Sequence, residues 1–257
     1  MKNSKKYSEK IEKLYRKLKK KYKKIPEISW EDPVEAMVFA IVSEDRTISE
    51  SEKIMKRLKK DFVDFNDLRV ALREEIIESL KGDKSLAKNT TLALSKALRC
   101  VFKRYNTTSL ADLTEKGKRD ARSELEEIDG ISEFVIEYVF LTALEGHAIP
   151  LTESMINYLR HNELVHPDAN RKDIEGFLSR IILSDDAYEF YYLLRTEARK
   201  NPPSKKTKQK TEKKKTGKSG SSKKKTRKKS KKKKTKSKRK SKKKTKTKNK
   251  KGRKKKG

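Results

Sequence analysis

Apolar residues in the first 200 positions recur three and four residues apart, which is the spacing of helices that pack by one face. Residues 7–24 show this pattern with lysines on the remaining faces. No alternating run of Val, Ile or Thr bounded by turns indicates a strand. The pattern predicts an all-α fold with about ten to twelve helices, at 7–24, 33–42, 49–58, 65–72, 74–81, 84–104, 109–113, 118–127, 133–144, 152–162, 171–182 and 185–199.

Several helix ends carry the residues that usually mark them. Asp32 precedes Pro33, which is the order of an N-cap followed by a proline at the first helical position. Ser49 and Glu52 have the spacing of a capping box, so we expect a helix to start there. Gly82 is expected to end the helix before it.

The last 57 positions differ from the rest of the chain. Residues 201–257 contain no apolar side chain and carry 33 basic residues against one acid, Glu212, a net charge of +32. Such a segment buries nothing that could offset its ordering entropy, so we expect it to be disordered. Residues 1–200 carry a net charge of +2 and roughly 40% apolar residues, as in an ordinary globular domain. We therefore expect a basic N-terminal helix and linker (1–29), a helical domain (30–200) and a lysine-rich tail (201–257).

Composition excludes several classes of protein. No apolar run approaches the ~20 residues of a membrane span, and the N-terminus lacks the apolar stretch of a signal peptide. A single cysteine, Cys100, excludes a disulfide framework and a multi-cysteine metal site. The three histidines show no metal-ligand spacing. We expect a soluble intracellular protein without a metal ion and without a membrane partner.

A tight turn at 128–132 joins two of the predicted helices. Gly130 supplies the one permissive backbone position that such a turn needs. Successive N–H groups at a turn of this kind, followed by a helix N-terminus, form a small anion-binding concavity. The alternative is an ordinary connection between helices. On the first interpretation, the backbone contacts to nucleic-acid phosphates come from Gly130, Ile131, Ser132 and Glu133.

Residues 125–165, LEEIDGISEFVIEYVFLTALEGHAIPLTESMINYLRHNELV, resemble the helix-hairpin-helix core of the endonuclease III superfamily of DNA glycosylases. In that family the pattern is approximately L-P-G-V-G-x-K-T-A, then a helix, then a proline leading into V-D-T-H and another helix. Residues 33–58, PVEAMVFAIVSEDRTISESEKIMKRL, are similar to the family's upstream helix, its S-A-Q-type loop and the next helix. The resemblance covers residues 30–200 and implies a two-lobed helical body that contacts DNA.

The departures from the family pattern bear on catalysis. The resemblance puts Phe134 at the position of the lysine that some members use as a Schiff-base nucleophile, and Thr152 at that of the catalytic aspartate. A phenylalanine forms no imine, and a threonine carries no charge that stabilises a cation. The family's four-cysteine cluster would follow the last helix, where this chain has none, so no iron–sulfur cluster is expected. Asp45 replaces the glutamine that enters the duplex from the upstream loop.

One carboxylate could rescue catalysis. Glu153 follows Thr152 directly, and a slip of one residue at Pro150 would bring it to the catalytic place. One position at a helix start rotates a side chain by ~100°, so we expect Glu153 to point elsewhere. Glu133 and Glu137 are expected to face solvent or to form local pairs.

The tail predicts polyanion binding. Lysine blocks broken by Ser, Thr and Gly resemble the C-terminal tails of linker histones and of some bacterial nucleoid proteins, and they bind phosphates through counterion release. The partner is expected to be DNA, through sequence-independent phosphate contacts, with RNA as an alternative. The location is then the nucleoid in a bacterial cytoplasm, or the nucleus. The predicted contact residues in the tail are Lys213, Lys214, Lys215, Lys223, Lys224, Lys225, Lys231, Lys232, Lys233 and Lys234.

Three functions fit these observations. The first is a DNA-binding protein on an endonuclease III-like body that has lost glycosylase chemistry. The second is a divergent base-excision-repair glycosylase that uses a relocated carboxylate. The third is a nucleoid-compacting architectural protein whose body serves dimerisation or partner binding. The positions of the carboxylates of Glu133, Glu137 and Glu153 relative to the hairpin distinguish the first two.

Overall fold

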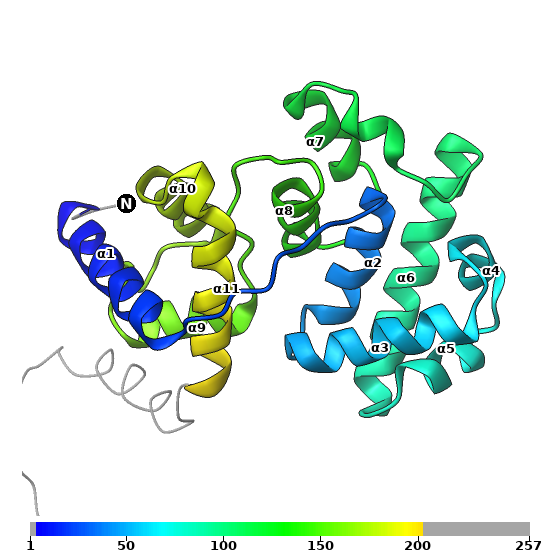
Figure 1. Cartoon of the computed structure of the whole chain (residues 1–257), viewed down its shortest axis with the longest axis horizontal. Coiled ribbons are helices and arrows are strands. Elements are labelled where there is room, and N and C mark those ends of the chain that lie inside the picture. Colours follow the sequence, from blue (N-terminus) through cyan, green and yellow to red (C-terminus); the bar gives the residue numbers. More distant parts are fainter. Residues whose placement is uncertain (1–3, 203–257) are drawn as a thin grey trace, which may run out of the picture. The chain divides into compact units, whose positions relative to one another are not determined.

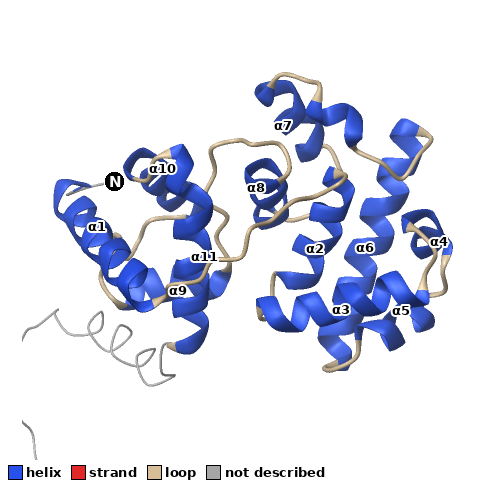
Figure 2. Ribbon diagram, in the orientation of Figure 1, coloured by secondary structure: helices blue, strands red, loops and turns tan. Residues whose placement is uncertain are grey.

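The computed structural model describes residues 4–202 of the 257-residue chain. Within that range the protein is entirely helical and has no strand, which confirms the predicted all-α class (Figure 2). The predicted helices agree closely with those of the structure. These are α1 (Ser4–Lys21), α2 (Pro33–Ser43), α3 (Ile48–Asp61), α4 (Phe65–Val70), α5 (Arg73–Leu80), α6 (Lys84–Tyr105), the 3₁₀ turn η1 (Ala111–Thr114), α7 (Lys118–Glu126), α8 (Glu133–Thr142), α9 (Glu153–His161), α10 (Arg171–Ile181) and α11 (Ser184–Lys200). The disorder predicted for the tail concerns residues outside the described range.

The helices form two lobes that share one core (Figure 1). One lobe is continuous in sequence: α2 packs against α3, α6 and α8, while α4 and α5 pack against α6. The other lobe joins both ends of the described chain, because α1 packs against α10 and α11, and α11 packs against α9. Contacts between α8 and α11 connect the two lobes.

Helix α2 is the central element of the first lobe. Asp32 caps it and accepts from the N–H of Val34 at 2.8 Å, with Pro33 at the first helical position as expected. Apart from Glu35, every residue of α2 is buried, which explains its nearly uninterrupted apolar sequence. The second carboxylate oxygen of Asp32 accepts from the hydroxyl of Ser109, so one residue ties the start of α2 to the segment before η1.

The predicted capping box at the start of α3 is wrong by two positions. The structure forms it with Thr47 and Glu50 instead of Ser49 and Glu52: the Thr47 hydroxyl accepts from the N–H of Glu50 at 3.2 Å, and the Glu50 carboxylate accepts from the N–H of Thr47 at 2.9 Å. Both pairs have the required spacing. The earlier start places Ile48 in the first turn of the helix, where it packs against the core.

The N-terminal helix α1 is packed through Ile11 and Leu18, which are both buried. Its Tyr15 hydroxyl lies 2.8 Å from the Asp186 carboxylate and 3.0 Å from that of Glu189 on α11, and its single proton is shared between these two acceptors. Burial, together with these two carboxylates, raises the pKa of Tyr15 far above its usual range. Two lysines of α1 also pair with acids of α11, since Lys19 lies 2.9 Å from Glu189 and Lys21 lies 2.7 Å from Glu197. These lysines therefore neutralise acids of α11.

Candidate nucleic-acid interface

The hairpin between α7 and α8 lies against α6. Gly130 has a φ of +90°, a conformation that L side chains rarely adopt. A Cβ at this position would lie 2.6 Å from Cβ of Lys96 and 3.1 Å from the carbonyl oxygen of Ala93. Gly130 is therefore required twice, once for the backbone conformation and once for the close approach to α6.

The N–H groups that were predicted to bind phosphate have no acceptor among the described residues. This holds for Gly130, Ile131, Ser132 and Glu133, of which Gly130 and Glu133 are exposed and the other two half-buried. The hydroxyl of Ser132 caps α8 by accepting from the N–H of Val135 at 3.3 Å. The hairpin therefore presents a short run of unpaired donors at a helix N-terminus, which is the geometry of an anion site.

An acid lies directly beside this hairpin. Glu44, which follows α2, accepts from the hydroxyl of Ser132 through Oε2 at 2.9 Å. Burial raises the pKa of the Glu44 carboxyl, while the Ser132 hydrogen bond lowers it in part. The neighbouring Asp45 is exposed. Sequence analysis anticipated the acid in the upstream loop at Asp45 and missed the contact of Glu44 with the hairpin.

Three arginines surround the same loop. Arg195 is 1% exposed and donates to the carbonyl oxygens of Ser43 and Arg46, while Arg199 donates to those of Glu44 and Arg46 at 3.4 and 3.3 Å. Arg46 donates to the carbonyl oxygen of Val42 at 2.8 Å. These contacts satisfy carbonyl groups at the C-terminal end of α2, where positive charge is favoured. They also place the last described turn of α11 beside the loop that contacts the hairpin.

The position that resembles the family's nucleophile is filled by a buried ring. Phe134 is fully buried, and its ring lies 6.0 Å from that of Tyr138 and 6.4 Å from that of Tyr191. The guanidinium of Arg195 lies 5.2 Å from its centroid. Phe134 therefore contributes to the core between α8 and α11, and it offers no nucleophile.

Thr152 has a structural role that needs no charge. It is the N-cap of α9, and its hydroxyl accepts from the N–H of Met155 at 3.4 Å and lies 2.9 Å from the hydroxyl of Ser154. The side chain is buried, with 2% exposure. A hydroxyl satisfies this cap as well as a carboxylate would.

The carboxylates that sequence analysis considered are all paired. Glu153 is exposed, and its Oε1 lies 2.8 Å from Nη2 of Arg171. Glu133 lies 3.7 Å from Nε of the same arginine and 3.4 Å from Nζ of Lys172. Arg171 thus brings Glu133 and Glu153 together at the N-terminus of α10. Glu137 is buried and forms a two-pronged pair with Arg122 of α7.

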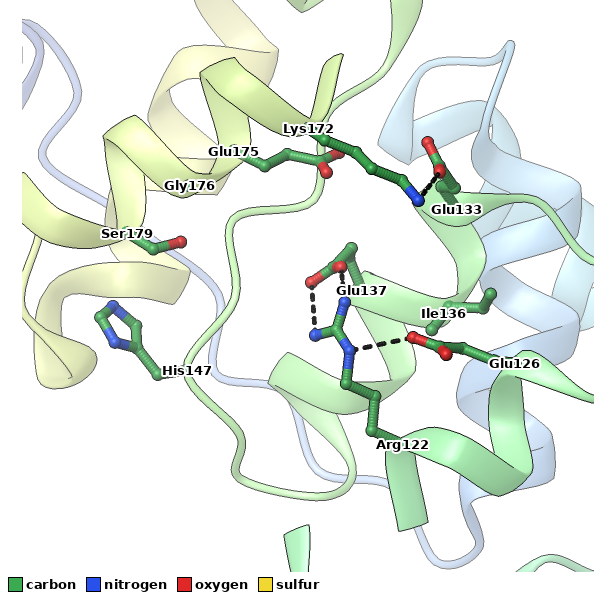
Figure 3. A pocket seen from close by; sticks show the side chains of 10 residues that line it. All are labelled: Arg122, Glu126, Glu133, Ile136, Glu137, His147, Lys172, Glu175, Gly176 and Ser179. Atoms are coloured by element: carbon green, nitrogen blue, oxygen red, sulfur yellow. Dashed lines mark hydrogen bonds and ion pairs between the residues drawn. The ribbon is translucent and has the colours of Figure 1, made fainter. Parts of the chain in front are cut away.

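A cavity of about 560 Å³ lies beside these pairs, between α7, α8 and α10 (Figure 3). Glu175 of α10 points into it, and its carboxylate faces Glu137 and the Arg122 side chain. Burial, followed by the charge of Glu137, raises the pKa of Glu175 to about 7. Its nearest cation is Arg171, with Nη1 at 3.9 Å, and its buried Oε1 has no hydrogen-bond partner.

Sequence analysis missed Glu175 because its spacing from Arg171 is that of a common surface ion pair on a helix. Only the tertiary fold brings Glu175 to the cavity that it shares with Glu137 of α8 and Arg122 of α7, where 12% of its side chain remains exposed. Within residues 4–202, no group of three or more His, Cys, Asp or Glu side chains could hold a metal ion. None of the described helices combines the length and the apolar character needed to cross a membrane.

No family model matches the sequence, and no curated protein is significantly similar to it. The structure is similar to several solved structures. A trapped covalent complex of endonuclease III with DNA has 17% identity and a TM-score of 0.59, covering 73% of this chain and 84% of that one. The Clostridium acetobutylicum 8-oxoguanine glycosylase/lyase with double-stranded DNA has 15% identity and a TM-score of 0.57, covering 78% and 71%. The H. pylori 3-methyladenine DNA glycosylase bound to 1,N6-ethenoadenine has 14% identity and a TM-score of 0.56, covering 77% and 97%.

The chain therefore has the endonuclease III-like helical fold with a helix-hairpin-helix motif, as the sequence resemblance implied. At these identities the likeness establishes the fold alone. The predicted tail contacts, from Lys213 to Lys234, lie outside the described residues. The expectation that no iron–sulfur cluster is bound stays a prediction.

Proposed function

We propose that this chain is a DNA-binding protein on an endonuclease III-like body that lacks glycosylase activity, and that its lysine-rich tail supplies most of the affinity. The observation that carries the proposal is the hairpin: its N–H groups from Gly130 to Glu133 have no acceptor among the described residues, whereas the side chain of the next residue, Phe134, is buried in the core. On this proposal, the hairpin retains the backbone N–H groups that bind phosphate, but it has no nucleophilic side chain at position 134.

Electrostatics support the loss of catalysis. Stabilisation of an oxocarbenium ion requires a preorganised carboxylate aimed at the sugar. The position suggested by resemblance holds the uncharged Thr152, and Glu153 and Glu133 are held by Arg171. A carboxylate neutralised by a bidentate or shared arginine is a poor stabiliser of a second cation. The carboxylates near the family's catalytic position are therefore poorly placed to support base excision.

The tail provides binding energy that does not depend on sequence. It leaves the body after α11, whose last turn contacts the carbonyl groups of Glu44 and Arg46 beside the hairpin. Its net charge of +32 releases counterions from every phosphate it neutralises, so log K should fall by about 0.9 per contact against log salt. We place the tail contacts on DNA, with RNA as an alternative polyanion.

The test is a set of glycosylase and abasic-lyase assays with duplexes that carry damaged bases or abasic sites, together with borohydride trapping of imines. We expect no turnover and no trapped species from the full chain, while gel-shift titrations show binding at low salt. Robust turnover that Thr152→Ala or Glu153→Gln abolishes would overturn the proposal. Full-length protein that ignores duplex DNA at low salt would overturn it as well.

A divergent glycosylase remains the second candidate, and one observation favours it. Glu175 has a pKa of about 7, which suits a general acid or base, and its cavity reaches Glu133 at the hairpin (Figure 3). If turnover is found, Glu175→Gln should abolish it and Glu74→Gln, an exposed change on α5, should not. Loss of activity through Glu175 would make this candidate the preferred function.

The architectural alternative is distinguished from the proposed function by comparing the affinity of residues 1–202 for duplex DNA with that of the full chain. Every buried residue of the described structure belongs to 1–202, and the tail has no apolar side chain, so the shorter protein retains the whole core. We expect it to bind duplex DNA more weakly than the full chain but measurably. If residues 1–202 bind no DNA at all, the hairpin has no function in binding and the architectural function is favoured.

A further inference from the structure

Helix α6 has an unusual charge composition. It is 22 residues long and contains six basic residues and no acidic residue, although the first 200 residues of the chain are nearly neutral. The basic helix α3 is different, because it contains Glu50, Glu52 and Asp61 as well as its cations, and its Lys59 pairs with Glu35. The basic residues of α6 are Lys84, Lys88, Lys96, Arg99, Lys103 and Arg104.

Five of these six cations lie on one exposed side of the helix. At 100° per residue, Lys84, Lys88, Lys96, Arg99 and Lys103 fall within about a third of the circumference. All five are exposed, and none forms an ion pair or a side-chain hydrogen bond with a described residue. The sixth, Arg104, pairs with Glu127. We call these five residues the α6 stripe.

The α6 stripe adjoins the hairpin. Gly130 packs against the backbone of α6 at Ala93 and Ala97 and beside the stem of Lys96. A small cavity of about 200 Å³ lies between Asn89 and Ala93 of α6 and Gly130 and Ser132 of the hairpin, and Glu44, Asp45 and Arg46 of the loop after α2 also line it. The unpaired N–H groups of the hairpin and the positive charges of the stripe therefore border on the same region of the surface.

The charge pattern is costly for the helix itself. Lys84 and Lys88, and likewise Arg99 and Lys103, are like charges four residues apart, which destabilise a helix. Buried residues of α6 such as Leu94 and Leu98 explain its packing, but they do not explain why its exposed side has no acid. A helix rise of about 1.5 Å per residue places Lys84 and Lys103 roughly 28 Å apart along the axis. A line of this length suits a stiff polyanion with regularly spaced charges.

We propose that the α6 stripe is a phosphate-binding surface that extends the hairpin contact along the backbone of duplex DNA. This inference rests on the proposed function, since it requires that the body bind DNA. The hairpin would hold one phosphate through backbone N–H groups, while Lys88, Lys96 and Arg99 neutralise further phosphates along the same duplex. The contact is electrostatic and independent of base sequence.

The experiment compares two triple variants of residues 1–202 and of the full chain. K88Q/K96Q/R99Q removes three charges from the α6 stripe, and the control K53Q/K56Q/K60Q removes three exposed charges from α3. Fluorescence anisotropy with an undamaged duplex is measured from 50 to 200 mM salt. For residues 1–202 we expect the α6 variant to bind at least about tenfold more weakly at 50 mM salt, with a log–log slope shallower by about two to three. The control variant should change affinity less than about twofold.

Thermal unfolding shows whether a variant that binds DNA more weakly has also lost stability. Because the α6 substitutions relieve repulsion between like charges, their unfolding midpoint should equal or exceed that of the unmodified protein. Equal losses of affinity in the α6 and α3 variants would overturn this inference while leaving DNA binding by the body intact. Unchanged affinity in the α6 variant would also overturn it, and would indicate a partner other than duplex DNA. If unmodified 1–202 binds no duplex, both this inference and the proposed role of the hairpin fail.

Discussion

Replacing Glu175 with Gln should stabilise the protein at neutral and alkaline pH and leave its stability unchanged in acid. Burial and the adjacent Glu137 raise the pKa of Glu175 from 4.5 to about 7. The native state therefore binds more protons than the unfolded chain between pH 4.5 and 7. Since a raised carboxyl pKa favours the protonated native form, the free energy of unfolding falls as pH rises through this window.

The structure sets the size of the effect. A pKa that rises from 4.5 to about 7 corresponds, at about 1.4 kcal/mol for each pH unit, to at most about 3.4 kcal/mol. The side chain keeps 12% exposure, and Nη1 of Arg171 lies 3.9 Å away, so we expect about 2 kcal/mol. For a protein of this size that equals roughly 4–8 °C in the thermal midpoint.

Urea denaturation at pH 4.5, 6, 7 and 8.5 measures this difference between Glu175→Gln and the unmodified protein. Burial also raises the pKa of Glu44, but Glu44 is present in both proteins and cancels in the comparison. Glu74→Gln, an exposed change on α5, serves as the control and should follow the unmodified protein. If the stabilities of the Glu175 variant and the unmodified protein change in parallel from pH 4.5 to 8.5, the pKa of Glu175 is not raised in the native state and the reasoning fails.

Substitutions at four further positions test the hairpin and the N-cap of α9. Gly130→Ala should lower the free energy of unfolding in urea by at least about 2 kcal/mol, because positive φ alone costs about 1–2 and the new Cβ would meet Lys96. Gly82→Ala, at φ +82° with no atom within 4 Å, should cost only the backbone strain, and an equal loss at both sites would refute the packing argument. Thr152→Ala should cost about 1 kcal/mol in the same assay, whereas Thr152→Asp should retain the cap; an equal loss of stability in both variants would contradict the N-cap role of this residue. Glu44→Gln should tighten duplex binding by residues 1–202, and the gain should shrink as the pH falls, since burial raises the pKa of the Glu44 carboxyl and a smaller fraction of it is ionised beside Ser132 at lower pH; a pH-independent gain in anisotropy titrations would argue against this.

Much of the fold could be predicted from the sequence because local signals and tertiary packing agree. Helices α2 and α6 begin at the predicted residues, where Asp32 and Asp83 cap them. The capping box of α3 shows the limit of such signals. Two overlapping pairs of residues had the right spacing, and their spacing alone does not distinguish them.

Some features of the candidate site could likewise be predicted from the sequence, and others could not. The sequence by itself determined the Gly130 turn, the absence of a nucleophile at Phe134 and of a charge at Thr152, and the polycationic tail, because each depends only on which residue occupies a position. Only the tertiary structure decided which charges meet. Arg171 joins Glu133 and Glu153, Glu44 reaches Ser132 across 88 positions of sequence, and Glu175 becomes buried against Glu137. Charge pairing and burial arise between elements distant in sequence, and so they could not be inferred before the helices were packed.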